Sequence, residues 1–301
     1  RRCLCDHWSR EEHGRAGEGA ARRTRRAARR RGPARVLAGI RRLEGATGLI
    51  LDDGRLELTD EADLSDPLLM LRCAVTAARH GGYLQRSSLE RLADHAVPLS
   101  NPWPDEAREL FVELLAVGLD AVPVIEDLDH VGLFVLLVPE WEQCRSRPQR
   151  NAYHRFTVDR HLMEAAAEAS RLVDRVDRPD LLLVGALFHD IGKGYPGDHT
   201  EVGVELLQVI APRMGFGADD ADLLVAMVQH HLLLPDVATR RDLDDDGTIR
   251  QVAEAVDDPL LLRLLAALTE ADSIATGPSA WSTWKASLVR ELVERTSHVL
   301  G

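Results

Sequence analysis

Lysine is nearly missing from this chain. Of its 37 basic residues only Lys193 and Lys285 are lysine, and the other 35 are arginine. Arginine together with abundant alanine, glycine and leucine suggests a GC-rich coding sequence. A lysine therefore departs from the default basic residue, and Lys193 stands out because it lies between two glycines.

Cysteine, aromatic residues and long apolar runs are scarce too. Four cysteines in 301 residues suggest no disulfide framework, which fits a reducing cytosol. The longest apolar runs, near 131–138 and 181–188, are too short to span a bilayer, and the Arg-rich start has no apolar segment typical of a signal peptide. We therefore expect a cytoplasmic protein without a membrane partner.

Charge is distributed unevenly. The formal net charge is −12, yet residues 1–35 hold twelve arginines against four acidic residues. A basic arm can bind nucleic acid, but aromatic residues do not alternate with the basic ones here. We expect residues 1–35 to be a solvated basic connector, and no nucleic-acid partner.

The next segment, 36–148, is predicted to be a helical accessory segment. Four leucines flank Asp52-Asp53-Gly54, and Asp-Gly between apolar runs is a strong hairpin signal, so we expect one short β-hairpin there after a helix start at 36–43. From Asp66-Pro67 onward the apolar spacing is helical. Pro148 to Asn151 is the most plausible boundary, leaving 149–301 as a second domain.

Residues 181–194, LLLVGALFHDIGKG, stand out in the second half. An apolar run predicts a buried helix that ends at His189 and Asp190, two side chains that can bind one cation. Two glycines then bracket Lys193, which suggests an anion site next to a metal site. A bare His-Asp pair at a helix end is more often a solvated polar cap.

Further histidines and aspartates make the metal interpretation stronger. Each lies on or at the end of a separate predicted helix: His161, His199, His230-His231 and Asp272. Asp272 follows Leu268 by four residues on an apolar face, where a carboxylate is costly unless it is paired or binds a cation. A helical bundle can direct all of these side chains into one cavity, and imidazole with carboxylate suits divalent Mn, Mg, Fe or Zn. The last helix is expected to face Trp281 and Trp284 inward.

This pattern resembles the HD-domain metal-dependent phosphohydrolases. Within them it is closest to the HD region of the bifunctional PII uridylyltransferase/uridylyl-removing enzymes of bacterial nitrogen control. The resemblance lies in four stretches: YHRFTVDRHLMEA (153–165), LFHDIGKGYPGDHTEVG (187–203), VQHHLLLPDVATRRDLDD (228–245) and LTEADSIATGPSAWSTWKASLVREL (268–292). It implies an all-α fold, an HD-type helical bundle after the accessory segment.

Two parts of that family are absent from the sequence. The nucleotidyltransferase motif, a Gly-Ser turn followed by an Asp-x-Asp strand, does not occur, and Asp52-Asp53-Gly54 does not supply it. The C-terminal pair of small ligand-sensing domains (ACT domains) is not found before Gly301. We therefore expect this chain to remove UMP from uridylylated PII protein and not to transfer UMP.

The resemblance also implies roles for individual residues. It makes His161, His189, Asp190 and Asp272 ligands of a first metal, Mn²⁺ or Mg²⁺ before Fe or Zn. His199 and His230 would be candidate ligands of a second metal, and His231 a weaker candidate. Lys193 would act in catalysis together with Asp190. Substrate binding would involve Lys193, Arg240 and Arg241.

Two other functions stay open at this stage. An HD phosphohydrolase could act on a free nucleotide such as a guanosine polyphosphate, and the family-like stretches beyond the metal ligands argue against this. A non-catalytic regulatory HD module is the other, and retention of all four first-metal residues argues against it.

Overall fold

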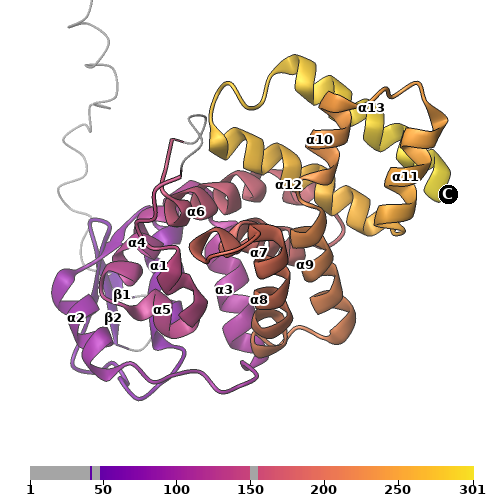
Figure 1. Ribbon diagram of the computed structural model, residues 1–301. Helices are drawn as coiled ribbons and strands as arrows, with labels where there is room; N and C mark the ends of the chain where they lie inside the picture. The colour runs from indigo at the N-terminus through magenta and orange to yellow at the C-terminus, as the bar shows by residue number, and fades with distance from the viewer. Residues whose placement is uncertain (1–40, 43–47, 150–154) are drawn as a thin grey trace, which may run out of the picture. The chain divides into compact units, whose positions relative to one another are not determined.

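The protein is described by a computed structural model that covers residues 41–42, 48–149 and 155–301. The predicted basic connector, 1–35, lies outside the described residues. Residues from Ile40 to Gly301 form one compact unit (Figure 1). Its α-helices are, in chain order, α1 (Leu69–Arg79), α2 (Arg86–His95), α3 (Asp105–Ala116), α4 (Val122–His130), α5 (Leu133–Leu137), α6 (Val158–Ala169), α7 (Pro179–Phe188), α8 (His199–Arg213), α9 (Ala218–His230), α10 (Leu233–Arg240), α11 (Asp246–Val256), α12 (Pro259–Thr276) and α13 (Thr283–Leu300).

Helix α7 lies at the centre of the unit. Every residue from Leu181 to Phe188 is buried, which is expected of a helix that is apolar on all sides. It is surrounded by α3, α6, α9 and α12, as Figure 1 shows. Because α7 is enclosed, whatever follows Phe188 begins inside the protein.

The remaining helices of the second half are arranged around this core. Helix α8 packs on α9, and α6 packs on α12. Helices α10 and α11 pack against α13, which in turn packs on α12. Trp284, on the first turn of α13, is 62% exposed, so the prediction that it faces inward was wrong. Trp281, which precedes α13, is half-buried as expected.

The first half contains the predicted hairpin, β2 (Leu49–Asp52) and β3 (Arg55–Leu58), joined by Asp53-Gly54. Both turn residues have positive φ, 45° and 82°, which the twist of a two-residue hairpin turn requires. Leu49 pairs with Leu58 and Leu51 with Leu56. Leu49, Leu56 and Leu58 are buried, and β3 contacts α1 and α2.

The hairpin is part of a larger sheet than the sequence predicted. Two strands of two residues extend it to four, in the order β1-β2-β3-β4, with β1 (Arg41–Arg42) antiparallel to β2 and β4 (Tyr83–Leu84) parallel to β3. The expectation of a single hairpin was therefore wrong, and so was the expected helix at Arg41 and Arg42; residues 36–40 and 43 lie outside the described residues. Strands this short carry no alternation to detect, and tertiary packing alone forms them. The helical fold class itself is confirmed.

The halves share one hydrophobic core, because α3 of the accessory segment contacts α7. The boundary near 148 stays a prediction. None of the helices in the described ranges combines the length and apolar character needed to cross a membrane.

Two glycines hold the loop after α7 in place. This loop includes a short 3-10 helix, η5 (Ile191–Gly194), which packs on α8. A Cβ at Gly192 would lie 2.0 Å from the carbonyl oxygen of His199, and a Cβ at Gly194 would lie 2.9 Å from Sγ of Cys144. Close packing, rather than an unusual φ, therefore requires both glycines.

We predict that Gly192→Ala lowers the free energy of unfolding by about 1–3 kcal/mol, because the methyl group meets backbone that cannot move alone. Gly217→Ala is the control. A Cβ at Gly217 meets no atom of the described residues within 4 Å, so its effect should be about 0.5 kcal/mol or less. Urea denaturation of both variants measures this, and equal stability of the two would contradict the packing argument.

Candidate metal centre

Three helices bring together the four residues of the expected first metal site. His161 lies on the first turn of α6, His189 and Asp190 directly follow α7, and Asp272 lies on α12. His161, His189 and Asp190 are at most 3% exposed, and the Asp272 side chain is 21% exposed. The cluster is therefore buried and reaches solvent on the Asp272 side.

The donor atoms converge. Nε2 of His161 lies 3.2 Å from Oδ1 of Asp272 and 3.8 Å from Oδ2 of Asp190. Nε2 of His189 lies 3.5 Å and 3.3 Å from the same two oxygens. All separations between these imidazoles and carboxylates are well below the 8 Å limit that a shared first shell allows.

A second group forms around the other oxygen of Asp190. Oδ1 of Asp190 lies 3.5 Å from Nε2 of His231 and 3.7 Å from Nε2 of His199. The nine-residue gap to His199 is bridged by η5, and Asp198 caps α8 by accepting hydrogen bonds from the backbone N–H groups of Thr200 and Glu201. Asp190 thus joins two groups, His161–His189–Asp272 and Asp190–His199–His231, each with donor atoms within 4.8 Å of one another.

His231, and not His230, takes part in this arrangement. His231 is 3% exposed, whereas His230 is half-buried and appears in neither group. The reason is helical phase, because His231 follows the buried residues Leu224 and Met227 by seven and four positions. The geometry therefore favours His231 over His230 as a candidate ligand, and this spacing was the sequence signal for it.

Backbone contacts orient two of the imidazoles. Nδ1–H of His189 donates to the carbonyl oxygen of Ala186 at 2.9 Å, and Nδ1–H of His231 donates to that of Val228 at 2.6 Å. With Nδ1 held by the backbone, Nε2 faces the cluster and can bind a cation there when it carries no proton. Metal-binding histidines are generally held in this way.

The charges of the cluster depend on one another. Burial lowers the pKa of His189, but the negative charges of Asp190 and Asp272 more than offset this and raise that pKa to about 10. Burial raises the pKa of Asp190, and His189, His231 and Lys193 outweigh it, so the pKa lies well below its usual range. The pKa of Asp272 is likewise held well below its usual range, against burial, by His161 and His189.

The unsatisfied atoms of this cluster fit a divalent cation. Nε2 of His189, Nε2 of His231 and Oδ1 of Asp190 are buried without a hydrogen bond to any residue of the described ranges. Buried polar atoms are rarely left without a partner, and lone pairs of imidazole and carboxylate are ligands for divalent metals. The His/Asp clusters therefore indicate divalent-metal binding.

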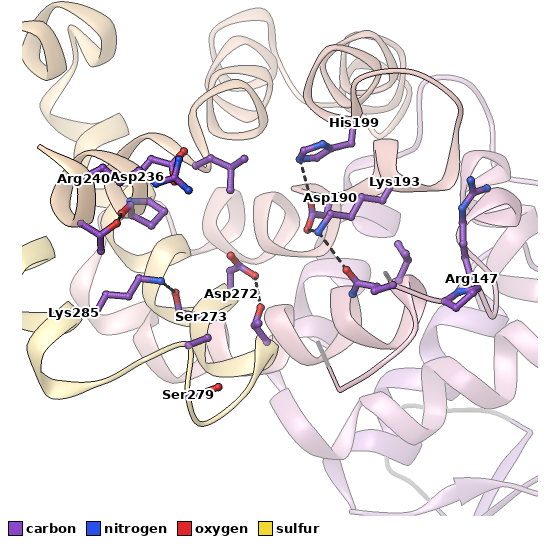
Figure 2. Close-up of a pocket in the computed structure, with 18 residues that line it drawn as sticks. Arg147, Asp190, Lys193, His199, Asp236, Arg240, Asp272, Ser273, Ser279 and Lys285 are labelled. Carbon is purple, nitrogen blue, oxygen red and sulfur yellow. Dashed lines mark hydrogen bonds and ion pairs between the residues drawn. The ribbon is translucent and has the colours of Figure 1, made fainter. Parts of the chain in front are cut away.

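The cluster opens into a cavity of about 1060 Å³. Figure 2 shows Asp190, Lys193 and His199 on one wall and Asp272, Ser273 and Lys285 on another. Nζ of Lys193 lies 2.5 Å from Oδ2 of Asp190 and donates to Gln149 at 3.3 Å. Arg147 of the accessory segment lines the same cavity. The segment also holds the loop after α7, because Arg147 donates to the carbonyl oxygen of Gly194 and Cys144 donates to that of Ile191.

Of the residues expected to bind substrate, some line the cavity and one does not. Lys193 and Arg240 line the cavity, and Arg240 pairs with Asp236 at 3.3 Å. Arg241 is exposed and does not line this cavity. Sequence reasoning missed Arg147 and Lys285, both of which do. For Lys285 the signal was that it is the second of two lysines in an arginine-rich chain.

Known proteins match this chain in two ways. The sequence pattern of the HD domain matches residues 158–275. The bifunctional uridylyltransferase/uridylyl-removing enzyme of Streptomyces coelicolor is 52% identical over 257 residues, which cover 85% of this chain and 31% of that enzyme. The enzyme of the same name from Mycobacterium tuberculosis is 47% identical over 259 residues, covering 83% and 32%.

The match to these enzymes extends beyond the HD domain into the accessory segment, since it takes in more than four fifths of the chain. The chain spans about a third of the length of these relatives. Residues 158–275 therefore match the HD domain, and the chain is similar to the HD-containing part of these enzymes.

Proposed function

We propose that this HD domain hydrolyses the phosphodiester that joins UMP to a tyrosine of the PII signalling protein, releasing UMP. The observation that carries the proposal is the double cluster of imidazoles and carboxylates around Asp190, at the base of a cavity with basic side chains on its walls. The support for this substrate is the name of the relatives, which are uridylyl-removing enzymes.

The proposed hydrolysis uses divalent metal ions. His161, His189, Asp190 and Asp272 hold one divalent cation, and His199 and His231 hold a second together with Asp190. Four imidazoles and two carboxylates suit a borderline to hard divalent ion, and Mn²⁺ or Mg²⁺ is proposed before Fe or Zn. Such an ion supplies polarisation of a water molecule and of a phosphoryl oxygen.

Side chains of the protein position the ions and the substrate. Asp190, by facing both groups of histidines, fixes the distance between them. Lys193, which lies against Asp190 on the cavity side, stabilises negative charge that develops on the phosphoryl oxygens. The tyrosyl oxygen leaves as a phenol when water has attacked phosphorus. A cavity of about 1060 Å³ lies at the upper end of the range for ligand pockets, which suits a nucleotide joined to a side chain.

A pair of neighbouring histidines tests the ligand assignment. We predict that His231→Ala lowers the number of Mn²⁺ ions bound per chain or weakens the second ion at least tenfold, because one of its imidazole ligands is lost. His230→Ala, the adjacent residue outside both groups, should bind Mn²⁺ as the wild type does. Equilibrium dialysis with elemental analysis measures both, and the reverse order of effects would contradict the assignment.

The substrate is tested directly. We expect this chain with Mn²⁺ or Mg²⁺ to release UMP from uridylylated PII, and to transfer no UMP from UTP to unmodified PII. Chromatographic detection of UMP and the mass of PII measure the two reactions. Addition of UMP would reveal a nucleotidyltransferase site, and cleavage of guanosine polyphosphates with no release from PII would assign the domain to a free nucleotide.

The same assay tests the roles of two residues. Asp190→Ala should abolish release, because both groups of histidines lose the carboxylate they share. Lys193→Ala should be milder, a loss on the order of 10²–10³ in rate, since it removes one charge contact. Equal losses in the two variants, with metal still bound, would contradict these roles, and full activity of Asp190→Ala would exclude catalysis at this cluster.

A further inference from the structure

The second lysine of the chain lies in the same cavity as the first. Lys285 is the third residue of α13, and Ser282 caps that helix by accepting a hydrogen bond from the Lys285 backbone N–H at 3.2 Å. Its side chain is half-buried and directed towards α12, as Figure 2 shows. Nζ donates to Oγ of Ser273 at 3.1 Å, and Ser273 follows Asp272 directly on α12. The ammonium group therefore lies next to the metal-binding cluster, on the wall opposite Lys193.

The pairing of the basic residues distinguishes Lys285 from Lys193 and Arg240. Lys193 is paired with the carboxylate of Asp190, and Arg240 with that of Asp236. Within the described ranges, Lys285 forms no ion pair within 4.0 Å, and its hydrogen-bond partner is the neutral hydroxyl of Ser273. An ammonium has three N–H donors, and this contact uses one. An anion that enters the cavity thus meets, in Lys285, a positive charge that no carboxylate already neutralises by contact.

The surroundings also keep this lysine in place. Nζ lies 6.0 Å from the centre of the Trp281 ring, and helix α13 packs on both α10 and α12. Burial lowers the pKa of Lys285, while the negative charges of Asp272 and Asp236 raise it, and burial is the larger effect. A partly desolvated cation binds a phosphate oxygen more strongly than one in open water does.

We propose that Lys285 binds the phosphate group of the substrate from the α13 side of the cavity and so positions phosphorus beside the cluster. The identity of the substrate as a uridylyl ester rests on the proposed function. The contact between Lys285 and a nucleotide phosphate is independent of that function, and it can be measured without PII. Lysine, as a compact point charge, suits contact with one oxygen of a phosphate that other groups also hold.

Binding of UMP to the Mn²⁺-loaded protein tests this, measured by isothermal titration calorimetry. Lys285→Met and Lys285→Gln should each weaken UMP binding about 10- to 100-fold, as loss of a charge-assisted hydrogen bond does. Lys285→Gln keeps a donor for Ser273, so it decides the question if Lys285→Met is poorly folded. Lys285→Arg keeps the charge and should restore most of the affinity. Inorganic phosphate should bind the wild type and these variants in the same order of affinity as UMP.

Arg290→Met is the matched control, because Arg290 lies on the same helix, is exposed and does not line the cavity. It should change UMP affinity less than threefold. Unchanged affinity in Lys285→Gln, an equal loss in Arg290→Met, or no UMP binding by the wild type would overturn the proposal. Loss of UMP affinity in a protein that fails to cleave uridylylated PII would leave Lys285 as a phosphate-binding residue and refute the uridylyl-removing function alone.

Discussion

Two carboxylates among imidazoles, Asp190 buried and Asp272 partly buried, impose the strictest constraint on this structure. A buried, unpaired charge costs several kcal/mol, so Asp190 and Asp272 can stay ionised only if cations or strong donors surround them. His189, His231 and Lys193 surround Asp190, and His161 and His189 surround Asp272, and these groups hold both pKa values low. A divalent cation bound at Nε2 of His189 would displace the proton of that imidazole, so metal binding would be coupled to proton release.

The rest of the fold sets the geometry of this charge cluster. A helix apolar on all sides delivers His189 and Asp190 to the interior, and it can do so only because other helices enclose it. Gly192 then allows η5 to touch the backbone of α8, which brings His199 to Asp190. Contacts from the accessory segment, such as the hydroxyl of Tyr195 donating to the carbonyl oxygen of Glu140, hold the same loop. The accessory segment is therefore part of the structural support of the site, and its similarity to the relatives has a physical reason.

Sequence reasoning succeeded where one residue's environment follows from its own helix. The apolar run before His189 predicted the central helix, and the four-residue spacing from Leu268 placed Asp272 on an apolar face. It failed where the partner element decides. The preference for His230 over His231 is a separate case, because the buried positions of α9 itself already favour His231. Lys285 on an exposed-looking helix start becomes part of the cavity only because α13 packs on α12, and two-residue strands form only when neighbours are already in place.

The central claim is that Asp190 and Asp272 are buried to hold a metal together with the histidines. Anomalous diffraction from crystals grown with Mn²⁺ tests it most directly. The account predicts a peak about 2.0–2.6 Å from Nε2 of His161 and His189 and from a carboxylate oxygen of Asp190 and of Asp272. A fully occupied Mn²⁺ site elsewhere in the chain, with His189 still paired to both aspartates and no peak among them, would contradict it.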